Sequence, residues 1–187
     1  MELLDKKTLD SLNEKLAVIE QSPGQSGPVE MILARPSKDK REMLQQCELN
    51  TETGLIGDNW IDRGDKHTAD GKSDPARQIT LMNCRSIAAI AGAKKENWQG
   101  AGDQFFVDFD LSDANLSAGS RFRLGSAILE VTVAPHLGCR KFSARFGKDA
   151  TLFVNSKKGR ALNLRGINAR IIKSGTVAVG DRISKLD

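Results

Sequence analysis

The amino-acid sequence predicts a mainly β protein: a small closed or partly closed β-barrel with a few α-helices outside it. Three observations support this fold class. Segments with strand patterns dominate, few of them are long, and most follow one another through short turns. Such a series is typical of small barrels, because closing the sheet removes its exposed edges. The chain has 187 residues, of which 39% are hydrophobic, and this suffices for one domain with its own core.

The first 28 residues are expected to form a helix and a linker, ahead of a main domain at residues 29–187. Apolar residues recur at three- and four-residue spacing before residue 21, which indicates one apolar helix face. The residues on this face are Leu9, Leu12, Leu16 and Ile19. We expect the face to pack on the domain or on the second subunit of a homodimer. The segment 22–28 is rich in proline and glycine and is expected to be the linker.

The first half of the domain is expected to mix strands with short helices. A strand at 29–34 ends before Pro36. A short helix is expected over 39–49, with Met43, Leu44 and Cys47 on one side.

A long polar tract at 57–77 is expected to be a loop, and loops of this length are usually functional or mobile. A buried strand at 78–82 and a helix at 86–93 follow it.

The second half is richer in strand patterns. Apolar and acidic residues alternate over 105–111, which is typical of a half-buried strand. Two period-two segments, 121–124 and 127–133, flank Gly125 and Ser126 and predict a hairpin. A helical tract over 140–155, with a break near Gly147, precedes two more strands at 168–172 and 176–179.

The cysteines and the apolar segments indicate a cytoplasmic protein. Cys47, Cys84 and Cys139 are odd in number and widely spaced, without a CxxC pair, so we expect free thiols in a reducing compartment. Cys47 is expected to be a core residue, and Cys84 is expected to have a structural role, either buried or partly exposed. The N-terminal residues lack the apolar region of a secretory signal, and no apolar run approaches the ~18 residues of a membrane span.

The charge balance does not favour a nucleic-acid partner. The net charge of +4 is a mild excess, and there is no Tyr, whereas single-strand binding uses exposed aromatic rings. A basic barrel that binds nucleic acid is therefore the least favoured functional interpretation.

The segment 134–142 carries the most informative chemistry. Cys139 follows a strand end and a Pro–Gly turn, at the expected start of a helix. A helix N-terminus, His136 and nearby basic residues each favour the thiolate. A thiolate attacks electrophiles, carries a sulfane sulfur or binds a soft metal. The alternative is that Cys139 is a small buried residue with a packing role only. A zinc site made of Cys139, His136 and His67 is a weaker alternative.

An ordered set of motifs makes the chain resemble a MOSC domain, the module named after the C-terminal part of molybdenum cofactor sulfurases. The resemblance runs from about Val29 to Asp181. Its motifs are Gly54–Asp58, Gln78–Asn83, Asp103–Asp108, Asn115–Leu116, Pro135–Phe142, Phe153–Ser156, Gly159–Arg160, Leu164–Gly166, Gly175–Val177 and Gly180–Asp181. The length before the domain resembles that of the small stand-alone bacterial members, without an aminotransferase-like or an additional N-terminal barrel domain.

The resemblance implies a MOSC-type β-barrel that binds the molybdenum cofactor, with Cys139 as molybdenum ligand. It implies an oxidoreductase that reduces small N-hydroxylated compounds with electrons from a partner protein. We expect Cys139 and His136 to be catalytic, with His136 orienting the loop or transferring protons. The expected cofactor-binding residues are Arg77, Lys141, Arg145, Asn155 and Arg160. The alternative is a carrier that holds a persulfide or the cofactor on Cys139 without turnover of its own.

Overall fold

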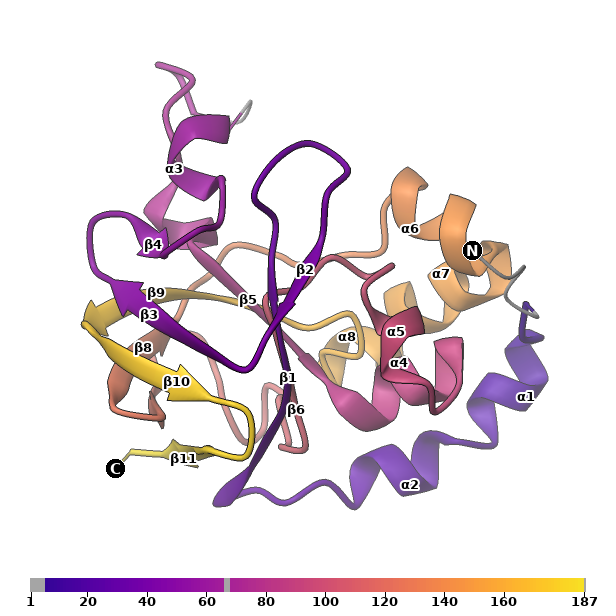
Figure 1. The fold of residues 1–187 in the computed structure, drawn as a ribbon. Coiled ribbons are helices and arrows are strands. Elements are labelled where there is room, and N and C mark those ends of the chain that lie inside the picture. The colour runs from indigo at the N-terminus through magenta and orange to yellow at the C-terminus, as the bar shows by residue number, and fades with distance from the viewer. Residues whose placement is uncertain (1–5, 66–67, 187) are drawn as a thin grey trace.

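The structure, a computed structural model, describes residues 6–65 and 68–186. Within these residues, seven strands close into a barrel in the order β1-β11-β7-β8-β9-β5-β6 and back to β1 (Figure 1). The strands are β1 (Ser26–Ala34), β5 (Ile79–Asn83), β6 (Phe105–Val107), β7 (Arg121–Leu124), β8 (Ala127–Val131), β9 (Ile167–Lys173) and β11 (Arg182–Lys185). The β5–β6 pair is parallel and the other barrel pairs are antiparallel. The mainly β barrel predicted from the sequence is confirmed.

Two smaller groups of strands extend the barrel. Strand β2 (Glu42–Leu44) pairs with the end of β1. Strands β3 (Gln46–Asn50), β4 (Gly54–Leu55) and β10 (Gly175–Ala178) form a separate small sheet, in the order β10-β3-β4. In Figure 1 this sheet lies beside α3 (Trp60–Arg63), and the loop between β1 and β2 rises between α3 and α6 (Arg140–Phe146).

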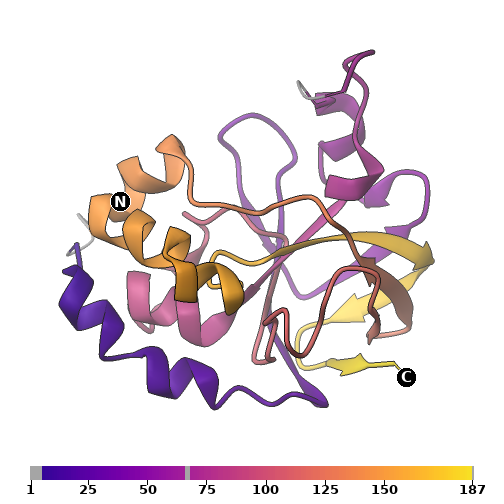
Figure 2. The same ribbon diagram turned by 180° about the vertical axis from the view of Figure 1, so that it is seen from behind.

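Most helices gather on one side of the barrel. They are α1 (Leu9–Asn13), α2 (Leu16–Glu20), α4 (Cys84–Ala91), α5 (Lys95–Trp98), α6, α7 (Lys148–Asn155) and α8 (Lys157–Ala161). Seen from behind in Figure 2, α1 packs on α7 and α2 packs on α4. The break that the sequence predicts at Gly147 separates α6 from α7.

The side-chain alternation of the strands builds two cores. Phe105 and Val107 of β6 point into the barrel, whereas Phe106 between them points outward to the helices. On β5, Leu81 and Met82 divide between the two cores in the same way. Because the helices cover this side of the barrel, both faces of these strands are buried.

The N-terminal segment belongs to the second core. Leu12 and Ile19, on the predicted apolar face, are buried there, so the helical face packs on the domain itself. The predicted single helix is two short helices, and the predicted linker is shorter, because β1 begins at Ser26 and pairs with β11. On the other side of β1, Gly27 permits the close approach of the residue after β6, since a Cβ at Gly27 would collide with the carbonyl oxygen of Asp108.

The helix predicted over 39–49 is wrong, and the segment forms β2 and β3 instead. Met43, Leu44 and Cys47 satisfy a helical spacing, but the burial of β3 alternates, with Cys47 and Leu49 inward and Glu48 outward. Pairing of β3 with β10 supplies the backbone hydrogen bonds that decide between the two structures. Tertiary pairing thus overrides a short local pattern.

Other predicted bounds differ more mildly. The strand predicted over 105–111 ends at Val107, although Phe109 and Leu111 still fill the barrel core. The polar tract 57–77 contains α3 and a 3₁₀ turn, η1 (Pro75–Arg77), within its described residues.

The predicted core position of Cys47 is confirmed, Cys84 is buried as well, and both thiols are free. In residues 6–65 and 68–186, no helix is long and apolar enough to cross a bilayer.

Candidate functional site

The residues from Thr132 to Cys139, here called the cysteine loop, connect β8 to α6 in an extended conformation. Burial alternates along this loop. Ala134, His136 and Gly138 are half-buried, while Leu137 and Cys139 are exposed. Successive side chains of an extended chain point to opposite sides. The loop therefore sends His136 inward and Cys139 outward.

Cys139 is the N-cap of α6, as the sequence predicts, and its thiol is exposed. Partial burial alone would raise the pKa of this thiol. The backbone N–H groups of Phe142 and Lys141 and the positive charge of Arg165 outweigh that effect, so the pKa of Cys139 is lowered. The site thus presents a thiolate-prone sulfur to solvent.

His136 does not face Cys139 but takes part in a buried charge network. Its Nε2 lies 2.6 Å from Oδ1 of Asp103, and the other carboxylate oxygen lies 2.6 Å from Nη1 of Arg165. Burial, and then the charge of Arg165, lower the pKa of His136 although Asp103 opposes this. Burial would raise the pKa of Asp103, but Arg165 and His136 outweigh it and hold that pKa below its ordinary value. At neutral pH this combination is a carboxylate, a guanidinium and a neutral imidazole.

Arg165 connects the network to the helix that Cys139 begins. Its guanidinium carbon lies 5.0 Å from the ring centroid of Phe142, in the first turn of α6, and Nη2 donates to the carbonyl of Ala101 at 2.9 Å. The side chain of Arg165 is 7% exposed and that of Asp103 is 0% exposed. A buried cation therefore lies beneath the turn that holds Cys139.

Asp103 and Arg165 were not predicted from the sequence as site residues. Each is a single charge within an otherwise apolar or glycine-containing buried stretch: Asp103 follows Gly102, and Arg165 lies between Leu164 and Gly166. Charged residues in such stretches are almost never fully buried unless they are paired. That pattern was the available signal, although it does not reveal which charges pair.

Two predicted cofactor-binding residues lie next to Cys139 in the structure. Asn155, at the end of α7, accepts from the N–H of Gly138 and donates to its carbonyl, both at 2.9 Å. Asn155 therefore holds the cysteine loop in place. Lys141 is exposed in the first turn of α6.

The other three predicted residues lie apart from one another. Arg145, in the last turn of α6, donates to the carbonyl of Gly100 at 2.7 Å. Arg160 is exposed on α8 and donates to the carbonyl of Asn155 at 3.0 Å. Arg77, on η1, lies 3.5 Å from a carboxylate oxygen of Asp65 and 3.4 Å from one of Asp74, so its charge is balanced locally.

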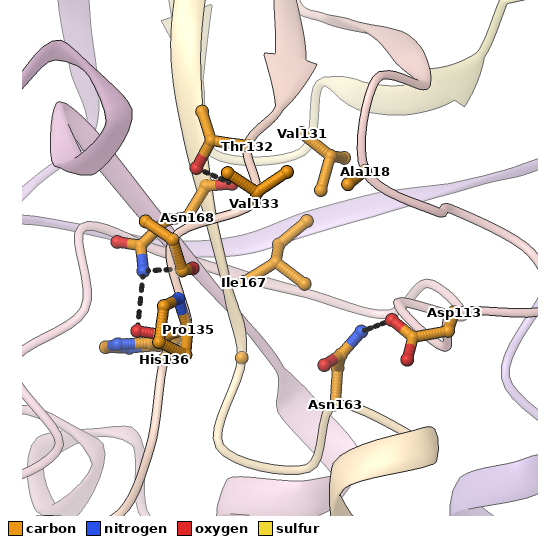
Figure 3. Close-up of a pocket in the computed structure, with 12 residues that line it drawn as sticks. Asp113, Ala118, Val131, Thr132, Val133, Pro135, His136, Asn163, Ile167 and Asn168 are labelled. Atoms are coloured by element: carbon orange, nitrogen blue, oxygen red, sulfur yellow. Dashed lines mark hydrogen bonds between the residues drawn. The ribbon is translucent and has the colours of Figure 1, made fainter.

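A groove runs along one side of the cysteine loop. Its two parts, of about 170 and 230 Å³, share Asp113, Pro135, His136 and Asn163 in their walls. Figure 3 shows the first part, where Asn168 donates to the carbonyls of Ala134 and Pro135 and holds the loop against β9 (Figure 3). Arg160 and Arg165 line the second part.

The structure offers no support for the zinc alternative among the residues it describes. No group of three or more His, Cys, Asp and Glu side chains that suits a metal ion occurs in 6–65 and 68–186. His67 lies outside the described residues, and His136 is turned away from Cys139 toward Asp103.

The barrel and the cysteine loop agree with what sequence comparison finds. The profile of the MOSC domain matches residues 58–184, which is more than half of the chain and includes Cys139 and the whole buried network. The chain belongs to the MOSC domain family. This match confirms the resemblance stated from the motifs. The molybdenum cofactor is associated with this family.

Solved structures support the MOSC fold. YuaD from Bacillus subtilis is similar with a TM-score of 0.56 and 21% identity, over 84% of this chain and 94% of that one. YiiM from Escherichia coli has a TM-score of 0.56 and 19% identity, over 87% of this chain and 70% of that one. YiiM from Geobacillus stearothermophilus has a TM-score of 0.58 and 12% identity, over 86% of this chain and 75% of that one. At these identities the likeness concerns the fold alone.

One curated relative has a functional name. A protein named "Reductase" from Gibberella moniliformis (strain M3125 / FGSC 7600) is 33% identical over 88 residues. The match covers 47% of this MOSC chain and 15% of the relative. The matched region is therefore a small part of that longer protein.

Proposed function

We propose that this MOSC protein binds the molybdenum cofactor through Cys139 and reduces N-hydroxylated compounds. The single observation that carries the proposal is the exposed thiol of Cys139, whose pKa is lowered by backbone N–H groups and by Arg165. The family and the relative named as a reductase support the same assignment.

The donor chemistry of the site fits the cofactor. A thiolate is a soft ligand and suits molybdenum, and a basic surrounding suits the phosphate carried by the pterin. When bound, the cofactor would supply two-electron redox chemistry at the metal, while the protein supplies ligation, orientation and electrostatics. Reduction of an N-hydroxyl group consumes two electrons and two protons and yields the N–H compound and water.

The protein side of this chemistry consists of positioning. Asn155 holds the peptide before Cys139, and the backbone N–H groups in the first turn of α6 lower the pKa of the thiol. Arg165 adds a positive charge that favours the thiolate. These contacts favour the deprotonated form of the sulfur, which is exposed to solvent.

His136 fits the orienting role better than the proton-transfer role. Because Asp103 is ionised, the His136 Nε2 that faces it carries the proton and donates the hydrogen bond. This bond anchors the middle of the cysteine loop to the barrel. The lowered pKa of His136 disfavours the protonated ring that a proton donor needs near neutral pH.

The electrons are proposed to come from a separate protein, because the sequence contains neither a flavin nor a nicotinamide motif. Such a donor would have to approach the exposed side of the cysteine loop, where Cys139 lies.

Metal and pterin analysis tests the proposal. Wild type, Cys139→Ser and the control Cys84→Ala are purified anaerobically from a host that makes the cofactor. We expect near-stoichiometric molybdenum and pterin in wild type and control, and neither in Cys139→Ser. Wild type and Cys84→Ala, but not Cys139→Ser, should reduce an N-hydroxylated base with a chemical reductant. Equal molybdenum in wild type and Cys139→Ser would contradict the proposal.

The same preparations test the carrier alternative, which the exposed thiolate also supports. A cyanide-labile sulfane sulfur that depends on Cys139, without molybdenum or turnover, would replace the reductase by a persulfide carrier.

A further inference from the structure

Residues 100–103 are surrounded by arginine side chains. Backbone carbonyls of this segment accept from three of them, and a fourth packs on the same segment. Arg145 donates to Gly100 at 2.7 Å, Arg165 to Ala101 at 2.9 Å and Arg35 to Gly102 at 3.3 Å. The guanidinium of Arg41 lies against Gly102, since a Cβ there would be 3.6 Å from Nη2 and 3.9 Å from Nε of Arg41.

Two of these four arginines have a carboxylate partner. Arg35 forms a two-pronged pair with Asp58, at 2.8 and 3.1 Å, and Arg165 pairs with Asp103. In the described part of the chain, neither Arg41 nor Arg145 forms an ion pair with a carboxylate. Two cations therefore remain without a partner of opposite charge at contact distance.

The environment of Arg41 is that of a cation that lacks a ligand. Its Nη1 donates to the carbonyl of Lys40, but Nε is buried without a hydrogen-bond partner. An unsatisfied buried donor is costly, and a guanidinium more so than a neutral group. Burial, then the charges of Arg145 and Arg35, lower the pKa of Arg41, and Asp39 only partly opposes them.

Arg41 and Arg145 line one cleft of about 440 Å³ between the β1–β2 loop, α5 and α6. Asp39, Glu96, Asn97 and Gln99 also contribute to its walls. The cleft opens beside the helix that Cys139 begins. Cys139 and Arg145 lie six residues apart on this helix, which corresponds to roughly 9 Å along its axis.

We propose that this cleft is a phosphate-monoester site, with Arg41 and Arg145 as the two residues that bind the phosphate. Guanidinium groups bind phosphate through charge-assisted and often paired hydrogen bonds, and the unpartnered Nε of Arg41 is one such donor. The inference deepens the proposed function: the phosphate is that of the cofactor, whose metal end is at Cys139. The same chemistry would bind free phosphate, and the experiment separates the two sources.

The test compares Arg41→Gln and Arg145→Gln with Arg123→Gln, which removes the same charge from an exposed site on β7. The first measurement is pterin and molybdenum content after expression in a cofactor-producing host. We expect each cleft variant to retain about tenfold less pterin than wild type, and Arg123→Gln to match wild type. Arg41→Lys and Arg145→Lys retain the charge and should recover part of the content, which excludes simple misfolding.

The second measurement uses cofactor-free protein with inorganic phosphate as the probe. Calorimetric binding should be present in wild type and Arg123→Gln and absent in both cleft variants. If wild type contains no pterin but binds phosphate through the two arginines, the site stands as a free-phosphate site and the proposed function fails. If wild type contains pterin and both Gln variants retain it fully, the site is overturned while the proposed function stands.

Discussion

Asn155 pairs with the backbone of Gly138 as a neighbouring β-strand would. The amide oxygen of Asn155 accepts from the Gly138 N–H and the amide nitrogen donates to the Gly138 carbonyl, each at 2.9 Å. The residue after Gly138 is Cys139, so the C-terminal end of α7 fixes the backbone that carries the exposed thiol. The hydrogen bonds of this one side chain thus join local structure to the reactivity of the site.

Asn155→Asp is expected to destabilise the protein and to raise the pKa of Cys139. The carboxylate keeps the acceptor for the Gly138 N–H but places a second oxygen against the Gly138 carbonyl. We expect a loss of about 1–3 kcal/mol in the free energy of unfolding, from urea titration. The added negative charge should slow alkylation of Cys139 by iodoacetamide at a given pH. Asn155→Ala, which loses both bonds without adding charge, should lower stability with a smaller effect on the thiol.

The three cysteines are expected to differ sharply in reactivity. Burial raises the pKa of Cys47 to about 12 and, with the charge of Asp108 as the next cause, that of Cys84 to about 12, whereas Cys139 is exposed with a lowered pKa. A thiol-specific disulfide reagent near neutral pH should therefore titrate one thiol in the native protein and three after denaturation. Cys139→Ser should leave none accessible in the native state, and rapid modification of that variant would refute this assignment.

Asp103→Asn is expected to cost about 3–5 kcal/mol of folding stability, because it leaves the buried guanidinium of Arg165 without its counter-charge. Denaturant titration measures this loss. The double variant Asp103→Asn/Arg165→Met removes both charges and should recover part of it. Asp62→Asn, at an exposed carboxylate of α3, should change stability little. Equal effects of the Asp103 and Asp62 changes would show that the pair does not contribute.

His136 should make stability depend on pH. Its pKa is lower in the folded protein than its ordinary value of 6.5, so the unfolded chain binds the proton more readily. Its contribution is therefore fully present above about pH 6.5 and is lost as the pH falls toward the folded pKa, at up to about 1.4 kcal/mol per pH unit. The pKa of Asp103 is also lowered, so protonation of this carboxylate in more acidic solution removes further stability.

His136→Gln separates these effects, since Gln keeps an N–H donor for Asp103 but does not titrate. The unfolding free energy of this variant should change less between neutral pH and mildly acidic pH than that of wild type. The same slope in both proteins would show that His136 does not contribute to the pH dependence.

Much of the barrel was predictable because its strands carry their own pattern. The hairpin around Gly125 and Ser126 and the buried strand of residues 79–83 have period-two or continuously apolar sequences bounded by turns. The segment 39–49 was mispredicted because three apolar residues satisfy a helix as well as a strand. The pairing with β10, more than a hundred residues later, decides it.

The features of the candidate site are likewise of two kinds, those set by local sequence and those set by tertiary contacts. The sequence by itself determined that Cys139 begins a helix after a Pro–Gly turn in a MOSC motif, since turn residues and motif order are local properties. Only the tertiary structure decided that His136 turns away from Cys139 to Asp103, that Arg165 lies beneath α6, and that Arg41 approaches Arg145. Charges pair or stay unpaired according to distance in space, and closure of the barrel sets that distance between segments far apart in the chain.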